Sequence, residues 1–258
     1  MTLSAFRASP TGWLNEEVID LVIPAKNGVV TKDAEKLTIE GVDYPLQDIT
    51  GNDRKKAMDF VVDTSRRIAE FRDGSANNLF FLPWKSDAFF SMTLDPSASI
   101  FLTAKVNGCC VWIGGDPTTP TIVHGNVYDK LPTPTSFQKA AEELMPEYDR
   151  LYAKAEKAMT SKGVLDSKSL TRFDPRFYLD GNPPRSLGFV WGFKDSSNRW
   201  TFYYQMERSA ETKKLKVPWR WPLIGVQWGH VGDWIESWAP KGRERFAGEL
   251  WPNREDMG

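Results

Sequence analysis

The stretch from Leu79 to Val127 most constrains the fold, because it consists of short apolar runs separated by turn residues. The runs cover Ile100 to Val106, Val111 to Ile113 and Thr121 to Val127. Runs of this length, bounded by Gly, Pro and Asn, are typical of β-strands. Both cysteines of the chain, Cys109 and Cys110, and one of its two histidines, His124, fall within sixteen residues of each other. The sequence therefore concentrates a candidate nucleophile and a candidate base on adjacent predicted strands.

Length and charge exclude several classes of protein. Because the chain has 258 residues, we expect a single domain over 1–258. Within it we expect a catalytic core at 79–127 and a Trp-rich C-terminal part at 187–258. No apolar run approaches the ~20 residues that span a bilayer, and residues 1 to 20 lack a signal-peptide pattern, so we expect a soluble protein without membrane insertion. Thirty-three basic residues balance thirty-four acidic ones, which argues against nucleic acid as the main partner. Two adjacent cysteines cannot link distant segments, which favours a reducing compartment.

Periodicity predicts an α+β fold. Helical spacing of Met58, Val61, Ser65, Ile68 and Ala69 predicts a helix from about Asp53 to Phe71. A second helix is predicted to follow the capping box Thr135 to Gln138 and to reach Ser161, with Pro146 kinking or dividing it. The predicted strands are Val18 to Ile23, a hairpin or short strand pair over Leu37 to Tyr44, and a hairpin of Leu187 to Phe193 with Trp200 to Met206. Residues 163–187 are predicted to be mostly loop.

Eight of the eleven tryptophans follow residue 190. One interpretation is that they fill the core and wedge loops against it. The other is an aromatic recognition surface, in which Trp219 and Trp221, next to Lys213, Lys214, Lys216 and Arg220, bind a protein or stack on single-stranded nucleic acid. The near-zero net charge weighs against nucleic acid. His230 has no ligand-spaced partner, and we expect it to be structural.

Other site chemistries lack their motifs. Neighbouring cysteines point to different sides of an extended chain, and the sequence has no CxxC or HxxxH spacing, so we expect no metal. The phosphate-binding motifs GxxxxGK[ST] and GxGxxG are absent, as is the GxSxG of serine hydrolases. We expect no cofactor.

Thiol catalysis remains as a hypothesis, alongside a purely structural cysteine. A cysteine becomes a competent nucleophile when an imidazole stabilises its thiolate. Gly108 permits a sharp turn that presents the backbone N–H groups of Cys109 and Cys110 as an oxyanion hole. The strand with His124 is predicted to return beside the cysteine strand, with Ile122 and Asn126 on the same face as the histidine. Thr103, six residues before Cys109, is predicted to face His124 from the next strand.

Four motifs resemble the bacterial toxin deamidases typified by the cytotoxic necrotizing factors, and more closely the Burkholderia lethal factor branch. They are Val106-Asn107-Gly108-Cys109, Ile122-Val123-His124, Leu82-Pro83-Trp84-Lys85 and the position of Thr103. The resemblance covers residues 79–127, about a fifth of the chain. The chain departs from the family pattern at Asn107, which replaces the usual serine, at the additional thiol of Cys110, and in a longer loop before His124.

The resemblance implies a cysteine-dependent glutamine deamidase that converts a glutamine side chain of a host or signalling protein to glutamate. Cys109 would be the nucleophile, His124 its ion-pair partner and proton carrier, and Thr103 the residue that holds the imidazole through its hydroxyl or carbonyl group. The backbone around Asn107, Gly108 and Cys110 would bind the oxyanion.

We expect Trp84, Asn126, Trp219 and Trp221 to contribute to binding. The resemblance also implies a two-sheet sandwich with the helices packed outside, and a delivered effector that acts in the target-cell cytosol. The alternatives are a transglutaminase that uses the same site and a non-catalytic protein-binding module on the same scaffold.

Overall fold

The computed structural model describes residues 20–22, 28–63, 68–106, 108–131, 140–167, 169–175, 187–217 and 235–251. The fold is α+β, with two mixed sheets and one α-helix in these residues, as the sequence predicted. The larger sheet has the strand order β1 (Asp20–Val22), β5 (Ile68–Asp73), β4 (Lys55–Asp63), β6 (Asn77–Leu82), β8 (Ile100–Thr103), β12 (Leu187–Lys194), β13 (Trp200–Val217) and β14 (Ile235–Trp251). The smaller sheet has the order β11 (Thr171–Phe173), β9 (Cys110–Gly114), β10 (Thr121–Gly125), β7 (Phe89–Thr93), β3 (Val42–Asp48) and β2 (Glu35–Ile39).

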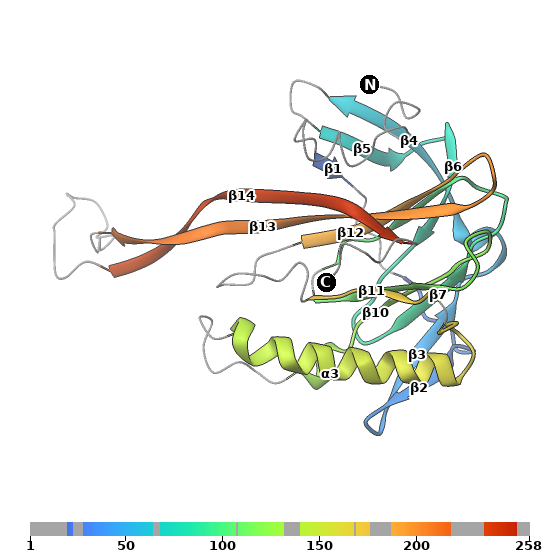
Figure 1. Cartoon of the computed structure of the whole chain (residues 1–258), viewed down its shortest axis with the longest axis horizontal. Coiled ribbons are helices and arrows are strands. Elements are labelled where there is room, and N and C mark those ends of the chain that lie inside the picture. The colour runs from blue at the N-terminus through green and yellow to red at the C-terminus, as the bar shows by residue number, and fades with distance from the viewer. Residues whose placement is uncertain are drawn as a thin grey trace.

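The six-stranded sheet lies between the eight-stranded sheet and helix α3 (Ala140–Ser161), as Figure 1 shows. Buried side chains of both sheets form one shared core, and the rings of Phe173 and Tyr204 stack across it with centroids 5.4 Å apart. On the opposite face of the six-stranded sheet, Trp112 meets Tyr152 of α3 edge-to-face at 5.5 Å and donates a hydrogen bond to Glu156. The sandwich therefore has a helix on one outer face.

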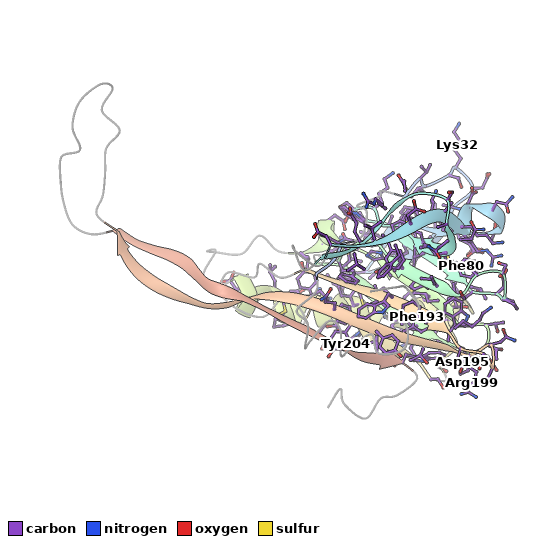
Figure 2. The ribbon with its side chains drawn as sticks, turned by 90° about the horizontal axis from the view of Figure 1, so that it is seen from above. Lys32, Phe80, Phe193, Asp195, Arg199 and Tyr204 are labelled. Carbon is purple, nitrogen blue, oxygen red and sulfur yellow. The ribbon has the colours of Figure 1, made fainter. Side chains whose placement is uncertain are left out.

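The eight-stranded sheet carries a second cluster of buried residues on its other face. Alternation along β6 sends Phe80 and Leu82 into the shared core, and Leu79 and Phe81 into this second cluster. Strands buried on both faces lose the apolar–polar alternation of a surface strand. Beyond β12, strands β13 and β14 continue as a long two-stranded arm (Figure 2).

The helix predicted from Asp53 to Phe71 is wrong. The chain forms a short 3-10 helix, η1 (Gly51–Arg54), and then β4 and β5, which pair antiparallel from Met58↔Asp73 to Asp63↔Ile68. The three- and four-residue spacing of apolar residues was misleading because Phe60, Val61 and Val62 favour strands and β4 is also paired with β6. One of the two predicted flanking helices is therefore a strand pair.

The other predictions of secondary structure largely agree with the structure. Helix α3 runs through Pro146 as one helix, so the proline does not divide it, whereas the capping box at 135–138 lies outside the described residues. The hairpins β2–β3 and β12–β13 are confirmed. The segment predicted as mostly loop contains a strand, β11, whose Arg172 bridges Asp149 of α3 and Asp174. A second 3-10 helix, η2 (Tyr128–Lys130), follows β10. No helix among the described residues is long and apolar enough to cross a bilayer.

Candidate active site

The β9–β10 ladder brings Cys109 and His124 to one face of the six-stranded sheet. The antiparallel register pairs His124 with Val111 and Gly125 with Cys110. Continued by one residue, this register sets Cys109 opposite Asn126, just beyond the ends of the two strands. Side chains alternate along a strand, so Cys109, His124 and Asn126 share the face that looks into the core between the sheets. Cys109 and His124 are then diagonal neighbours, a relationship with a typical Cα separation of about 7–8 Å.

Asn126 contacts the candidate nucleophile directly. Its side-chain Nδ2 donates a hydrogen bond to Cys109 Sγ over 3.3 Å, and its backbone N–H donates to the carbonyl of Ala88. Its Oδ1 accepts the backbone N–H of Asp87 at 3.4 Å. Cys109 is 2% exposed and Asn126 4% exposed, so the amide meets the sulfur in a nearly dry environment. An amide donor at this position stabilises negative charge on sulfur.

The imidazole of His124 is buried, at 1% exposure, and neither Nδ1 nor Nε2 makes a hydrogen bond. Burial lowers the pKa of His124 to about 3, because the charged ring would lose its hydration. The carbonyl groups of Pro83 and Leu82 lie near the ring and partly oppose this shift of the pKa, without forming hydrogen bonds of good geometry. In this arrangement the ring is neutral at physiological pH and has a free nitrogen that can accept a proton.

Thr103 does not hold the imidazole, contrary to the prediction. It belongs to β8 of the other sheet, where it pairs with Leu82 of β6, rather than to the strand next to His124. Its hydroxyl donates to the carbonyl of Val190 at 3.2 Å and accepts the N–H of Val190 at 3.0 Å. These two bonds tie β8 to β12 and leave the hydroxyl occupied. Its carbonyl group does not bond the ring either, since both ring nitrogens are without a partner.

The two adjacent cysteines point to opposite faces of the sheet. Cys110 is the first residue of β9 and faces α3, where burial raises the pKa of its thiol, with a smaller contribution from the negative charge of Asp174. A buried thiol with a raised pKa is a poor nucleophile. The structure therefore distinguishes Cys109, which shares its face with His124, from Cys110, which packs against the helix.

Gly108 forms the turn before Cys109 with a positive φ of 81°, as the sequence predicted. An ideal Cβ on Gly108 would lie 2.7 Å from the hydroxyl oxygen of Tyr148, so α3 closes over this turn. The hydroxyl of Tyr152 donates a hydrogen bond to the carbonyl of Gly108. The positive φ favours glycine at this position, and a Cβ here would require the Tyr148 hydroxyl to shift.

Loops at the end of the sheet surround Cys109 and Asn126. Asp87, with a positive φ of 54°, accepts the backbone N–H of Asp129 at 2.8 Å and thereby joins the segments before β7 and after β10. Trp84 is half-buried and its carbonyl accepts the N–H of Gly28. Asn107, Trp219 and Trp221, which the sequence singled out, lie outside the described residues. No sequence pattern predicted Asp87, because its role follows from its position in the turn.

The side chains of both Cys109 and His124 are buried in this structure. Three surface cavities of about 380, 420 and 410 Å³ lie elsewhere, and neither Cys109 nor His124 lines any of them. The third reaches Pro83, whose carbonyl lies near His124. Within the described ranges, no group of three or more His, Cys, Asp or Glu side chains is placed to hold a metal ion.

Comparison with known proteins adds no family to these observations. No protein-family model matches the chain, and no curated protein matches it.

Proposed function

We propose that the chain is a cysteine-dependent hydrolase of carboxamides, with Cys109 as the nucleophile and His124 as the general base. The observation that carries this proposal is the hydrogen bond from the Asn126 amide to Cys109 Sγ, at the end of the β9–β10 ladder. The register of this ladder, continued by one residue, sets Cys109 on the same face as His124. Glutamine as the substrate side chain comes from the resemblance of residues 79–127 to the toxin deamidases.

The chemistry begins from a neutral pair rather than from an ion pair. Because burial keeps His124 neutral, its free nitrogen takes the proton of the Cys109 thiol as sulfur attacks the carboxamide carbon. The tetrahedral intermediate collapses by breaking the C–N bond, and the imidazolium gives its proton to the departing ammonia. Water then adds to the thioester, passes a proton to His124, and releases the thiol and glutamate. The net reaction consumes one water and releases one ammonia.

Substrate must reach a sulfur that is buried in this structure. Cys109 and Asn126 lie where the β9–β10 ladder ends, so exposing them breaks fewer backbone hydrogen bonds than exposing the middle of the sheet. The proposal therefore includes an opening of the loops around Asp87 and Asp129. The target would be a protein of a host or signalling system in the cytosol of the target cell.

The test compares Cys109→Ser with Cys110→Ser, two neighbouring buried thiols on opposite faces. The purified variants are incubated with a cell lysate, and glutamine sites that gain about one dalton are mapped by mass spectrometry, with and without the amine monodansylcadaverine. We expect such sites with the wild type and Cys110→Ser, and none with Cys109→Ser or His124→Ala. Incorporation of the amine in place of hydrolysis would assign the same site to a transglutaminase. If no site distinguishes the wild type from Cys109→Ser, the proposal is wrong.

A further inference from the structure

The turn before β7 favours one orientation of the Asn126 amide. The Nδ2 of Asn126 donates to Cys109 Sγ at 3.3 Å, and its Oδ1 accepts the backbone N–H of Asp87 at 3.4 Å. A side-chain amide has donors on its nitrogen and an acceptor on its oxygen. If the amide turned over, its nitrogen would meet the N–H of Asp87, and its oxygen would meet the sulfur. The N–H of Asp87 therefore favours the orientation that presents a donor to Cys109.

The backbone of Asp87 adopts an unusual conformation at this contact. Its φ is 54°, in the left-handed region that residues other than glycine rarely occupy, although aspartate and asparagine tolerate it better than most. Such conformations persist only where surrounding contacts hold them, and they cluster at functional sites. The direction of the Asp87 N–H therefore depends on what holds the turn.

The side chain of Asp87 supplies contacts that hold this turn. Its Oδ1 accepts the backbone N–H of Asp129 at 2.8 Å, and its Oδ2 accepts the hydroxyl of Ser86 at 2.9 Å. Asp129 is held in turn by Tyr44, whose hydroxyl donates to the Asp129 carboxylate at 2.6 Å. The Asp87 carboxylate thus ties the segment before β7 to the segment after β10.

The end of the β7–β10 ladder explains why Asp87 reaches a side chain. The two strands pair from Thr121↔Thr93 to Gly125↔Phe89, and the N–H of Asn126 continues the ladder by donating to the carbonyl of Ala88 at 3.1 Å. Asp87 lies one residue beyond Ala88. There its N–H donates to the side-chain oxygen of Asn126.

We propose that Asp87 is a positioning residue for the reaction at Cys109. Its carboxylate holds the left-handed turn, and the N–H of that turn keeps the Asn126 amide directed at the sulfur. Asp87 acts through Asn126. Its effect on the reaction rate rests on the proposed hydrolase, whereas its effect on the amide does not.

Three substitutions of Asp87 separate the backbone conformation from the hydrogen bond. Asp87→Asn keeps an acceptor oxygen and tolerates positive φ, Asp87→Gly keeps only the backbone conformation, and Asp87→Ala keeps neither. The side-chain amide resonances of Asn126, assigned by their absence in Asn126→Ala, are followed by NMR in the full-length chain. We expect them to stay in place in Asp87→Asn. They should move toward those of a free asparagine amide in Asp87→Gly, and further in Asp87→Ala.

The matched control for backbone conformation is Asn198→Ala, because Asn198 has a φ of 61° in the exposed turn between β12 and β13. This variant should lose stability without moving the resonances of Asn126. The rate of deamidation should fall roughly 5- to 10-fold in Asp87→Ala, as for the loss of one neutral hydrogen bond, and Asp87→Asn should restore it. In the Asn126→Ala background, Asp87→Ala should lower the rate no further, because the side chain that it positions is absent.

Two results would overturn the proposal. One is an unchanged set of Asn126 resonances in Asp87→Ala, and the other is an equal loss of rate from Asp87→Ala with and without the Asn126 side chain. If thermal unfolding shows that Asp87→Ala does not fold, Asp87→Gly takes its place in both comparisons. Resonances that move as expected in a protein that deamidates no site would support the positioning role of Asp87 and reject the proposed hydrolase.

Discussion

The side-chain amide of Asn126 donates a hydrogen bond to Cys109 Sγ over 3.3 Å, at the point where strands β9 and β10 end. The contact exists because these two residues continue the register that sets His124 opposite Val111. The β9–β10 ladder therefore positions both the proposed nucleophile and the proposed base. A substitution that shifts either strand should move both side chains.

Replacing Asn126 tests whether this contact contributes to the reaction. Hydrogen bonds to charged groups contribute about 1.5–3 kcal/mol, so Asn126→Ala should lower the rate of deamidation by about 10- to 100-fold. Asn126→Asp should be slower still, because a carboxylate opposes charge on the sulfur. The rates are measured on the glutamine sites mapped in the lysate, with Asn78→Ala, at an exposed position of β6, as the control. An Asn126→Ala enzyme as active as the wild type would limit this contact to a structural role.

The buried histidine predicts a loss of stability in acid. The pKa of His124 is about 3 in the folded chain and near 6.5 when unfolded, so below pH 6.5 the unfolded state binds the extra proton. The contribution of His124 to the free energy of unfolding is fully present above pH 6.5. It falls by about 1.4 kcal/mol per pH unit down to pH 3. Between pH 7.5 and 5 the wild type should lose about 2 kcal/mol more than His124→Leu, measured by urea unfolding.

The comparison with His124→Leu isolates the histidine from the carboxylates. Glu40, whose pKa is lowered to about 2 by hydrogen bonds from Lys154 and Arg150, also loses its contribution as pH falls, but equally in both proteins. If the free energies of unfolding of the wild type and His124→Leu change with pH in parallel, the imidazole of His124 gains its proton in the folded state at ordinary pH.

The two cysteines should differ in reactivity although both are buried. Cys109 lies just outside β9, so we expect local opening at the end of the ladder to expose it, whereas Cys110 is paired with Gly125 and its thiol has a raised pKa. N-ethylmaleimide should therefore label Cys109 at least about 10-fold faster than Cys110 under native conditions. Peptide mapping over a time course measures both rates. Faster labelling of Cys110 would place the opening on the side of α3.

The sequence was most informative where a pattern has one structural solution. Apolar runs around Cys109 and His124 predicted adjacent strands, and the alternation of β10 set Asn126 and His124 on one face. The hydrogen-bond partner of Thr103 could not be predicted, because its spacing of six residues from Cys109 does not determine which sheet its strand joins. Thr103 lies in the eight-stranded sheet, whereas His124 lies in the six-stranded sheet. The strand pair β4–β5 was mistaken for a helix because its apolar residues also fit a helical period, and long-range pairing with β6 decided the outcome.

The turn at Gly108 offers a test in which strain and steric contact can be separated. Gly108→Ala places a Cβ at positive φ, which costs about 1–2 kcal/mol, and also 2.7 Å from the hydroxyl oxygen of Tyr148. Gly163→Ala is the matched control, because Gly163 has a similar φ of 74° and nothing within 4 Å of its Cβ. We expect Gly108→Ala to lower the free energy of unfolding more than Gly163→Ala does.

The additional loss of unfolding free energy in Gly108→Ala, relative to Gly163→Ala, should become smaller when Gly108→Ala is combined with Tyr148→Phe. The second substitution removes the oxygen atom that the new Cβ would contact. Urea unfolding of the single and double variants measures the coupling. If Gly108→Ala and Gly163→Ala lower the free energy of unfolding equally, the side chain of Tyr148 moves aside without cost. If the turn positions the nucleophile, Gly108→Ala should also slow deamidation, whereas Gly163→Ala should leave the rate unchanged.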